Sequence, residues 1–446
     1  MNILFTTSAA PSKSPFFTSE KRPPLGLGTL ISIARNKGHG AFFIDNYLSP
    51  SRFIEKGFLQ ENDIDIVAIH ANTICFRDTL RMLNAIEDLR KRDLWRGKMI
   101  VGGPHTSVAV ETIPEFVDHV VQGEGEKALE DILSGRAESR IIRGERITDL
   151  DSLPSQPWDI FTKLPYDYQC KWIDEAPVFT INTSRGCPFN CTFCSVSSVW
   201  GKRYSFLSAD RIISEIEYLI ENHNAKGIYF REDHFTLNTN RTREFCEKLI
   251  VKNIDISWAC ETRVDVLSEE LIELMSRAGC RAFYLGVESG SQNVLDKLRK
   301  DITLEQIENV SIWSNRYSVR TYWSLIVGTP HDTFKDYIAT KRLIKKLKPY
   351  SHAFNVYVGI PGSSLYKYIS RNNLYEYKDD IGLLYLPGFD VKTKYFYGAN
   401  SKKLVDYRFR LRTPFDKRLL KRMWRVPFRI LKNRLSGFIK KIASPR

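Results

Sequence analysis

Residues 178–194 have the sequence VFTINTSRGCPFNCTFC, an apolar and β-branched run followed directly by a loop that holds three cysteines. Cys187, Cys191 and Cys194 fall within eight residues, with glycine, proline and asparagine interspersed among them. Those interspersed residue types favour a loop, so the thiols do not line one face of a helix as core positions. The stretch therefore places three thiols at the carboxyl end of a strand, where barrel-type α/β folds hold their functional residues.

Strand and helix patterns alternate from this stretch onward, through residues 178–371. Apolar and β-branched runs predict six strands, and amphipathic patterns predict helices between them. The expected strands are residues 178–184, 227–233, 256–264, 282–289, 320–328 and 353–359, and the expected helices are 208–222, 240–252, 268–278, 291–299 and 332–347. Six β–α units predict an open, partial (β/α)6 TIM-like barrel.

A second alternation of strands and helices occupies residues 1–135. The expected strands are residues 2–7, 41–45, 64–70, 98–103 and 118–123, and the expected helices are 25–37, 52–61, 76–92 and 125–134. This order predicts a Rossmann-like, doubly wound parallel sheet in an α/β fold. Residues 136–177 lose the rhythm and carry two prolines in LDSLPSQPWDIF, so we expect a linker there. Residues 372–446 form a C-terminal extension.

The composition is that of a globular chain: 446 residues, 43% apolar, 26% charged and 12% aromatic. Such values exclude a disordered or fibrous protein. No apolar run reaches the roughly 18 residues of a membrane-spanning helix, and the first residues lack the apolar core of a signal peptide. We therefore expect a cytoplasmic protein, whose eight cysteines serve as free thiols, in catalysis or in metal binding rather than in disulfides.

The net charge of +14 comes from one end of the chain. Residues 402–446 hold 16 Lys and Arg against two Asp, whereas residues 1–401 hold 50 basic and 50 acidic residues. In residues 415–442 apolar residues recur in three- and four-residue steps opposite a basic face, with Pro427 interrupting the pattern. A basic amphipathic helix with Trp and Phe favours the inner surface of an anionic membrane. The alternatives are a helix that covers the open side of the barrel and, ranked last, nucleic-acid binding.

Three clustered thiols allow two kinds of metal site. A structural zinc site needs four ligands, and only His223 and Cys246, both distant in sequence, are available as partners. Three thiolates suit an iron–sulfur cluster in which one iron stays open to a substrate or cosubstrate. The missing fourth cysteine would then be the functional position.

The pattern C-x3-C-x2-C after the first strand of a βα barrel resembles the signature of radical S-adenosylmethionine (radical SAM) enzymes. The resemblance implies that Cys187, Cys191 and Cys194 are the catalytic, metal-binding residues that hold a 4Fe-4S cluster, and Phe193 matches the aromatic residue before the last cysteine. In that family the open iron binds S-adenosylmethionine, and an electron from the cluster releases a 5′-deoxyadenosyl radical. The resemblance also implies a reductant such as flavodoxin or ferredoxin.

Further segments resemble the same family, strand by strand. YFREDHFTLN (229–238) implies Glu232 and Asp233 near the bound cofactor, although the family's usual first Asp is Glu here. WACETRVD (258–265) implies that Glu261 and Arg263 approach the cofactor, and an Arg fork can bind both oxygens of a carboxylate. GVESGSQNVLDKLRK (286–300) implies Glu288 and Ser289 near the ribose. LIVGTPHDTFKD (325–336) resembles the fifth-strand motif, with His331-Asp332 in place of Gly-Glu.

These matched residues also have structural interpretations. Glu288 could stabilise the start of helix 291–299, for which Ser291 would serve as N-cap. Arg263 could belong to a structural ion pair. Because the matches occur in register on successive strands, they support one another as a cofactor site.

The amino-terminal sheet is similar to the cobalamin-binding domain found ahead of many radical SAM barrels. The residues that carry this similarity are PPLGLGTLISIARNKGH (23–39), VGGPH (101–105) and VVQGEGEKAL (120–129). The similarity implies that cobalamin is bound at the carboxyl ends of the expected fourth and fifth strands. The implied cofactor-binding residues are Gly102, Gly103, Gly123 and Gly125.

One departure concerns the lower cobalt ligand. Many cobalamin domains supply it from an Asp-x-His-x-x-Gly motif, whereas DNYLSP (45–50) here has no His. The alternative is a Rossmann-like domain that binds no cofactor and only packs on the barrel. His70, His105 and Cys75 lie near expected strand ends, and we expect structural roles for them.

Together the resemblances cover about residues 1–365 and predict a cytoplasmic radical SAM enzyme. We expect cobalamin-dependent methyl transfer to an unactivated carbon of an unknown small-molecule or lipid substrate. The alternative is radical cyclisation, oxidation or rearrangement on the same scaffold. Methylthiolation of transfer RNA is disfavoured, because such enzymes carry three further cysteines where residues 1–150 hold only Cys75. A non-catalytic iron–sulfur scaffold would form no 5′-deoxyadenosine.

Overall fold

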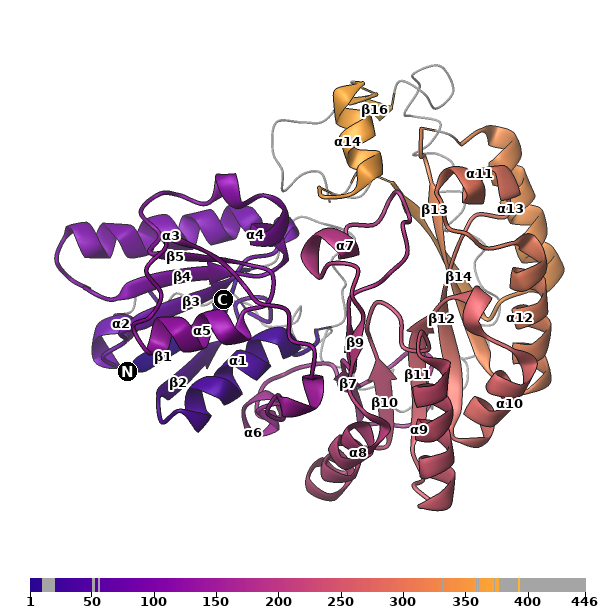
Figure 1. The fold of residues 1–446 in the computed structure, drawn as a ribbon, viewed down its shortest axis with the longest axis horizontal. Helices are drawn as coiled ribbons and strands as arrows, with labels where there is room; N and C mark the ends of the chain where they lie inside the picture. The colour runs from indigo at the N-terminus through magenta and orange to yellow at the C-terminus, as the bar shows by residue number, and fades with distance from the viewer. Residues whose placement is uncertain are drawn as a thin grey trace, which may run out of the picture. The chain divides into compact units, whose positions relative to one another are not determined.

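The computed structural model describes residues 1–9, 21–49, 53–54, 57–330, 332–357, 359, 361–372, 374–376 and 392–393. The basic segment 415–442 and His331 lie outside these described residues. Within them, two six-stranded sheets carry the fold, sheet A near the amino terminus and sheet B in the following residues (Figure 1). None of the described helices has the length and apolarity needed to cross a membrane.

Sheet A is fully parallel, with the strand order β2-β1-β3-β4-β5-β6. Its strands are β1 (Asn2–Thr7), β2 (Gly40–Ile44), β3 (Ile66–His70), β4 (Lys98–Gly102), β5 (His119–Gln122) and β6 (Ile141–Arg143). The first five confirm the doubly wound, Rossmann-like prediction. The sixth strand lies in the segment expected to be a linker, and its three residues are too few for a periodic signal.

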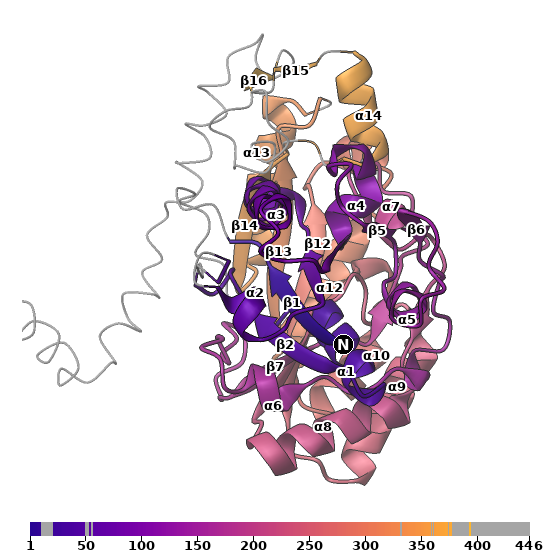
Figure 2. The ribbon, with the colours of Figure 1, turned by 90° about the vertical axis from the view of Figure 1, so that its left-hand side faces the viewer.

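Helices cover both faces of sheet A. They are α1 (Leu25–Asn36), α2 (Phe58–Glu61), α3 (Phe76–Lys91), α4 (Pro104–Val108) and α5 (Glu126–Leu133), with 3-10 turns η1 (Thr73–Cys75) and η2 (Val110–Thr112). Successive strand residues enter different cores, because side chains alternate across a strand. Ile3 and Phe5 pack with residues of α1 and α5, whereas Leu4 packs with residues of α3. Figure 2 shows sheet A between these helices.

Sheet B is also parallel, and its strands follow one another in chain order from one edge to the other. They are β7 (Val178–Ile181), β10 (Gly227–Phe230), β11 (Ser257–Thr262), β12 (Cys280–Glu288), β13 (Arg320–Val327) and β14 (Ser351–Val356). This order confirms the partial six-stranded barrel. The separate antiparallel pair β8 (Ser184–Arg185) and β9 (Ser205–Phe206) encloses the cysteine loop.

Helices alternate with the strands of sheet B along the chain. They are α7 (Val196–Val199), α8 (Ala209–His223), α9 (Thr239–Val251), α10 (Glu269–Arg277), α11 (Gln292–Lys297), α12 (Leu304–Arg316), α13 (Phe334–Leu347) and α14 (Ser364–Arg371), with η4 (Val264–Val266) and the short strands β15 (Tyr375–Glu376) and β16 (Lys392–Thr393). The predicted helices omit α12, although its start carries a signal. Thr303 and Gln306 form a capping box there, the pattern that commonly begins a helix.

The segment between the sheets holds η3 (Leu150–Ser152) and α6 (Trp158–Phe161). Trp158 is buried, and its indole N–H donates to Glu215 Oε1 on α8 at 2.7 Å. Its ring also meets Phe179 of β7 edge-on at 5.3 Å. The expected linker is therefore packed into the barrel core at this point.

Candidate functional site

The three cysteines of the loop line one cavity of about 400 Å³ at the carboxyl ends of the sheet B strands. Cys187, Cys191 and Cys194 are half-buried free thiols. Burial raises the pKa of the Cys194 thiol to about 12 and that of Cys187 above its usual value. A thiol binds a metal as the thiolate, so a metal that binds here displaces the thiol protons even though burial has raised the pKa.

The three thiols of the cavity supply the ligands that a 4Fe-4S cluster with one open iron requires. Among the described residues, no group of three or more His, Cys, Asp or Glu side chains is placed to hold one ion. A 4Fe-4S cluster does not need thiols that converge on one point, because each thiolate binds its own iron. His223 contacts Phe179 and Tyr218, and Cys246 is buried in α9, so the fourth-ligand candidates for zinc do not line the cysteine cavity.

Arg263 reaches the cysteine loop from the end of β11. Its Nη1 lies 3.6 Å from Cys191 Sγ, and its guanidinium stacks 3.7 Å from the ring centre of Phe189, a residue of the loop. The other side of the guanidinium is occupied, because Nε and Nη2 donate to the two carboxylate oxygens of Asp265 at 2.8 and 2.9 Å. Asp265 thus occupies the pair of N–H donors that we expected to bind a ligand carboxylate. The remaining edge of the Arg263 guanidinium faces the thiols.

A buried ion pair forms another wall of the cavity. Lys300 Nζ donates to Glu288 Oε1 at 2.7 Å, and both side chains are 7% exposed. Phe193, the aromatic residue before the last cysteine, packs with Val294 and Leu298 behind the loop, and its ring centre lies 5.8 Å from Lys300 Nζ. Lys300 is the last residue of segment 286–300, and no pattern in that segment marks it as a cavity residue.

Two further carboxyl groups line the cavity. Glu261 accepts a hydrogen bond from the Tyr229 hydroxyl at 2.7 Å, and burial raises its pKa to about 7. Asp233 is exposed and opens into the cavity. Both carboxyl groups can accept hydrogen bonds there, and Glu261 can also hold a proton near neutral pH, as groups at functional sites often do.

Glu232 and Ser289 do not line the cysteine cavity. The Glu232 carboxylate accepts from Thr183 Oγ1 at 2.9 Å and from the Ser184 amide at 2.8 Å, so it fastens the end of β10 to the start of the cysteine loop. Ser289 is buried against Thr340 of α13, with their hydroxyls 3.4 Å apart. Ser291 begins α11, but its hydroxyl donates to Asp336 rather than capping the helix.

A second cavity, of about 210 Å³, lies between sheet A and helices α1 and α5, and it opens at the carboxyl ends of the strands. All four expected glycines, Gly102, Gly103, Gly123 and Gly125, line it. Gly103 has φ +112°, and a Cβ there would lie 2.7 Å from the Ala71 carbonyl oxygen. Gly123 has φ +83°, so both positions favour glycine. An apolar cavity with a glycine rim allows a large ligand to approach the backbone.

The histidines and cysteine near these strand ends have different surroundings. His105 is fully buried, stacks on Phe76 at 3.8 Å and is hydrogen-bonded to two threonine hydroxyls, so it is structural as expected. Cys75 is also buried, and burial raises its pKa to about 12. His70 differs, because its imidazole lines the glycine cavity. Burial lowers the pKa of His70, so the ring is neutral.

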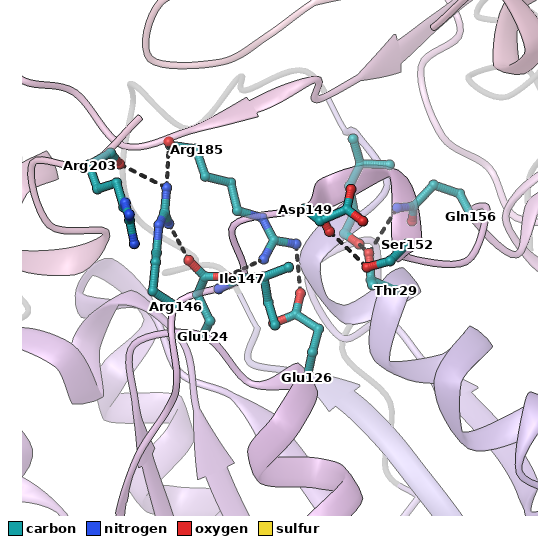
Figure 3. A network of polar contacts seen from close by, with 11 residues as sticks. Thr29, Glu124, Glu126, Arg146, Ile147, Asp149, Ser152, Gln156, Arg185 and Arg203 are labelled. Atoms are coloured by element: carbon teal, nitrogen blue, oxygen red, sulfur yellow. Dashed lines mark hydrogen bonds and ion pairs between the residues drawn. The ribbon is translucent and has the colours of Figure 1, made fainter. Parts of the chain in front are cut away.

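A polar network joins the glycine cavity to the cysteine loop (Figure 3). Arg185, two residues before Cys187, donates to Glu124 at 2.8 Å and to Glu126 at 2.6 Å, beside the glycines of the β5–α5 loop. Arg146 binds Glu124 as well and donates to the Arg185 carbonyl at 2.6 Å. Burial opposes the charge on Arg185, but the two carboxylates outweigh it and raise the pKa of the guanidinium. The chain segments that border the two cavities are thus fastened together.

Comparison with known proteins identifies both halves of the chain. Residues 181–344 match the Radical SAM superfamily, and residues 20–133 match the B12 binding domain. An uncharacterized methyltransferase of Pyrococcus horikoshii is 30% identical over 397 residues, which cover 84% of each chain. The anaerobic magnesium-protoporphyrin IX monomethyl ester cyclase of Rubrivivax gelatinosus is 25% identical over 380 residues, 77% of this chain and 66% of the cyclase.

The fold is also found in a solved structure. The radical S-adenosylmethionine methyltransferase TsrM from Kitasatospora setae, with cobalamin and a 4Fe-4S cluster bound, matches with a TM-score of 0.66 at 15% identity. The match covers 83% of this chain and 75% of TsrM. The similarity therefore extends over both sheets and shows that they share the fold of that enzyme.

Alanine substitution of any one loop cysteine is expected to prevent retention of an iron–sulfur cluster, because three thiolates are the fewest that can hold a cluster with one open iron. Cys187→Ala, Cys191→Ala and Cys194→Ala would each be reconstituted anaerobically, and iron and sulfide would be measured per chain. Cys75→Ala is the matched control, since this buried thiol lies outside the loop. Full cluster content in a loop variant, or its loss in the control, would contradict the assignment.

Arg185→Met is expected to destabilise residues 123–126 and 184–194 together, because it leaves the buried Glu126 carboxylate without its cation. Breaking a buried ion pair costs about 3 kcal/mol, so amide exchange through local opening should accelerate roughly a hundredfold. Hydrogen-exchange mass spectrometry would compare residues 123–126 and 184–194.

The control for this experiment is Arg136→Met, which removes an exposed ion pair with Asp131 in the same half of the chain. It should leave exchange in both segments unchanged, because exposed pairs contribute little. Acceleration confined to one segment would show that the network does not couple them.

Proposed function

Because the chain belongs to the radical S-adenosylmethionine enzymes that carry a B12-binding domain, we propose that it methylates an unactivated carbon of its substrate. It is an enzyme, and its cofactors are a 4Fe-4S cluster, S-adenosylmethionine and cobalamin. When bound, the cluster and S-adenosylmethionine supply a 5′-deoxyadenosyl radical, and cobalamin supplies the methyl group. The acceptor carbon and the substrate are parts of the proposal.

The proposal rests on one observation: a single buried network of ion pairs connects the borders of the two cavities. Arg185 precedes the cysteine loop by two residues, lines the glycine cavity and binds two carboxylates at that cavity's rim. Methyl transfer to an unactivated carbon needs hydrogen abstraction and methyl delivery at the same substrate atom. A scaffold that holds both cofactor sites in fixed register meets this need, because misplaced reactants lose most of their rate advantage.

We assign roles within this proposal by position. Cys187, Cys191 and Cys194 hold the cluster, and Arg263 stabilises the Cys191 thiolate from 3.6 Å. Asp233 and Glu261 accept hydrogen bonds from polar groups of the bound S-adenosylmethionine, since both open into the cysteine cavity. The four glycines of the second cavity take cobalamin.

A radical cyclisation or oxidation is the second candidate, favoured by the similarity to the magnesium-protoporphyrin cyclase of Rubrivivax gelatinosus. The same residues would then generate the adenosyl radical, and cobalamin would have another role. The two candidates differ in the fate of the S-methyl group. In methyl transfer it would end in the product and leave S-adenosylhomocysteine, whereas in the other reactions it would remain in methionine.

Holoenzyme incubated with methyl-13C S-adenosylmethionine and a strong reductant is expected to form labelled methylcobalamin as well as 5′-deoxyadenosine. Anaerobic protein would be reconstituted with iron, sulfide and hydroxocobalamin, and mass spectrometry would follow both products and S-adenosylhomocysteine. This measurement needs no knowledge of the substrate. Formation of 5′-deoxyadenosine with an unlabelled corrinoid and no S-adenosylhomocysteine would contradict methyl transfer and favour the second candidate.

We further propose that the substrate is delivered from an anionic membrane surface. This part rests on the sequence alone, because residues 415–442 lie outside the described residues. Their basic amphipathic pattern suits the headgroup region, where each Lys or Arg contributes about 1 kcal/mol. A lipid or a lipid-dissolved molecule would then reach the enzyme without crossing water.

Replacing five basic residues of this segment with Gln is expected to weaken binding to phosphatidylglycerol vesicles at least a hundredfold, from about 1 kcal/mol per charge. The substituted residues are Lys417, Arg418, Lys421, Arg422 and Arg425. A matched control removes five exposed charges from α13 and its end, and these are Lys341, Arg342, Lys345, Lys346 and Lys348. Equal losses in both variants, or strong binding to neutral phosphatidylcholine vesicles, would contradict the proposal.

A further inference from the structure

A third cavity, of about 230 Å³, borders both the glycine cavity and the cysteine cavity, and we call it the middle cavity. Gly26, Arg185 and Trp200 line both the middle cavity and the glycine cavity, and Asp233 lines both the middle cavity and the cysteine cavity. A molecule held there is adjacent to both cofactor sites. A carbon that loses a hydrogen atom at one site and gains a methyl group at the other needs such a position.

One arginine of the middle cavity has no partner for its charge. Arg185 is held by two carboxylates, and Arg211 donates to the Ser155 hydroxyl at 3.0 Å and lies 3.6 Å from Glu215. Arg231, directly after β10, makes no side-chain hydrogen bond or ion pair within the described part of the chain. Its guanidinium therefore keeps the planar set of donors that matches a carboxylate or a phosphate.

The strand register directs Arg231 into the barrel. Phe230 packs edge-on against Phe245 of α9 outside the sheet, and side chains alternate along a strand, so Tyr229 and Arg231 point to the interior. There Arg231 lies beside Glu261 on the neighbouring strand β11. The Glu261 carboxylate accepts from the Tyr229 hydroxyl at 2.7 Å and forms no ion pair with the arginine. The charge of Arg231 is thus available to a ligand in the barrel interior.

An aromatic stack ends at the same level of the barrel. The ring centre of Tyr284 lies 4.6 Å from that of Tyr322, and Tyr322 lies 4.7 Å from Trp172. In the register of the sheet, Tyr284 is the neighbour of Glu261, which is the neighbour of Arg231. Tyr284 lines the cysteine cavity, and none of the other described rings contacts it. A flat ring of a ligand can therefore continue the stack, an arrangement that stabilises aromatic pairs.

Two buried donors in the barrel interior also lack an acceptor. Thr180, which pairs with Tyr229 across β7 and β10, is 5% exposed, and its hydroxyl has no hydrogen-bond partner among the described residues. The indole N–H of Trp172 is likewise without a partner there. Buried polar groups usually have a partner, so both donors favour a ligand that brings oxygen atoms into this interior.

We propose that the substrate carries a flat ring and an anionic oxygen group, a carboxylate or a phosphate, with Arg231 binding the anionic group and Tyr284 stacking on the ring. The assignment rests on the proposed function and specifies its substrate. Arg231 and Tyr284 stand on β10 and β12, roughly 10 Å apart at about 4.8 Å per strand. A two-ring acid is long enough to contact both, and it would cross the place near Asp233 where the middle cavity meets the cysteine cavity.

The test uses three probes that share one ring system: naphthoate, naphthyl phosphate and the uncharged naphthamide. Anaerobic holoenzyme loaded with cluster, cobalamin and S-adenosylmethionine would be titrated with each probe by isothermal titration calorimetry. At least one acid should bind about tenfold more tightly than naphthamide, because a charge-assisted bidentate contact is stronger than a neutral one. The tighter of the two acids tells whether the site takes a carboxylate or a phosphate.

Three variants assign the contacts. Arg231→Met should abolish the preference for the acid and leave naphthamide binding within about twofold, because the amide never used the charge. Tyr284→Leu should weaken all three probes alike. Arg281→Met, which removes another exposed arginine at the start of β12, should change none of them.

Equal binding of acids and amide to the wild type, an unchanged preference in Arg231→Met, or no binding of any probe in the millimolar range would overturn this assignment. The fate of the labelled methyl group tests the proposed function separately. Selective binding of an acid by an enzyme that forms no labelled methylcobalamin would count against methyl transfer and leave the ligand class intact.

Discussion

The arrangement of the two cavities depends on one buried ion-pair network. Arg185 lies two residues before the first cysteine of the loop and binds Glu124 and Glu126 of the amino-terminal half. Buried charges are costly unless they are paired, so removal of either the arginine or the carboxylates would leave an unpaired buried charge. Gly186 lets the chain turn from Arg185 into the loop, because a Cβ there would collide with the Arg203 carbonyl oxygen. The start of the cysteine loop is thereby fastened to the rim of the glycine cavity.

The charged side chains in and beside the cysteine cavity have different roles. Asp265 orients Arg263 toward Cys191, and Glu288 orients Lys300 into the open space. Glu232 is used to hold the loop, through the Thr183 hydroxyl and the Ser184 amide. The two basic side chains of the cavity, Arg263 and Lys300, are therefore each anchored by a carboxylate. Such preorganised groups act without the reorganisation that free side chains would need.

Much of this architecture could be predicted from the sequence, because the patterns that indicate the strands and the cysteine loop are local. The strands of both sheets are rich in apolar, β-branched and aromatic residues, and the three cysteines are neighbours in the chain. The short strand β6 could not be predicted, because three residues show no period, whereas the start of α12 carries a capping box that marks a helix. The ion pair of Arg263 joins it to Asp265, two residues later in the chain. This Arg-x-Asp spacing is a weak signal, because it also occurs in many surface pairs. The Arg185–Glu124 pair joins residues 61 positions apart, and no local pattern reports such a contact.

The proposed function requires that one scaffold hold a cluster and a corrinoid in fixed register. Pulsed electron double resonance measures it directly, on holoenzyme with the reduced 4Fe-4S cluster and cob(II)alamin as the two spins. Fixed cofactor positions should give a single narrow distance distribution, insensitive to added S-adenosylmethionine. A broad distribution, or the absence of dipolar coupling when both cofactors are bound, would contradict it.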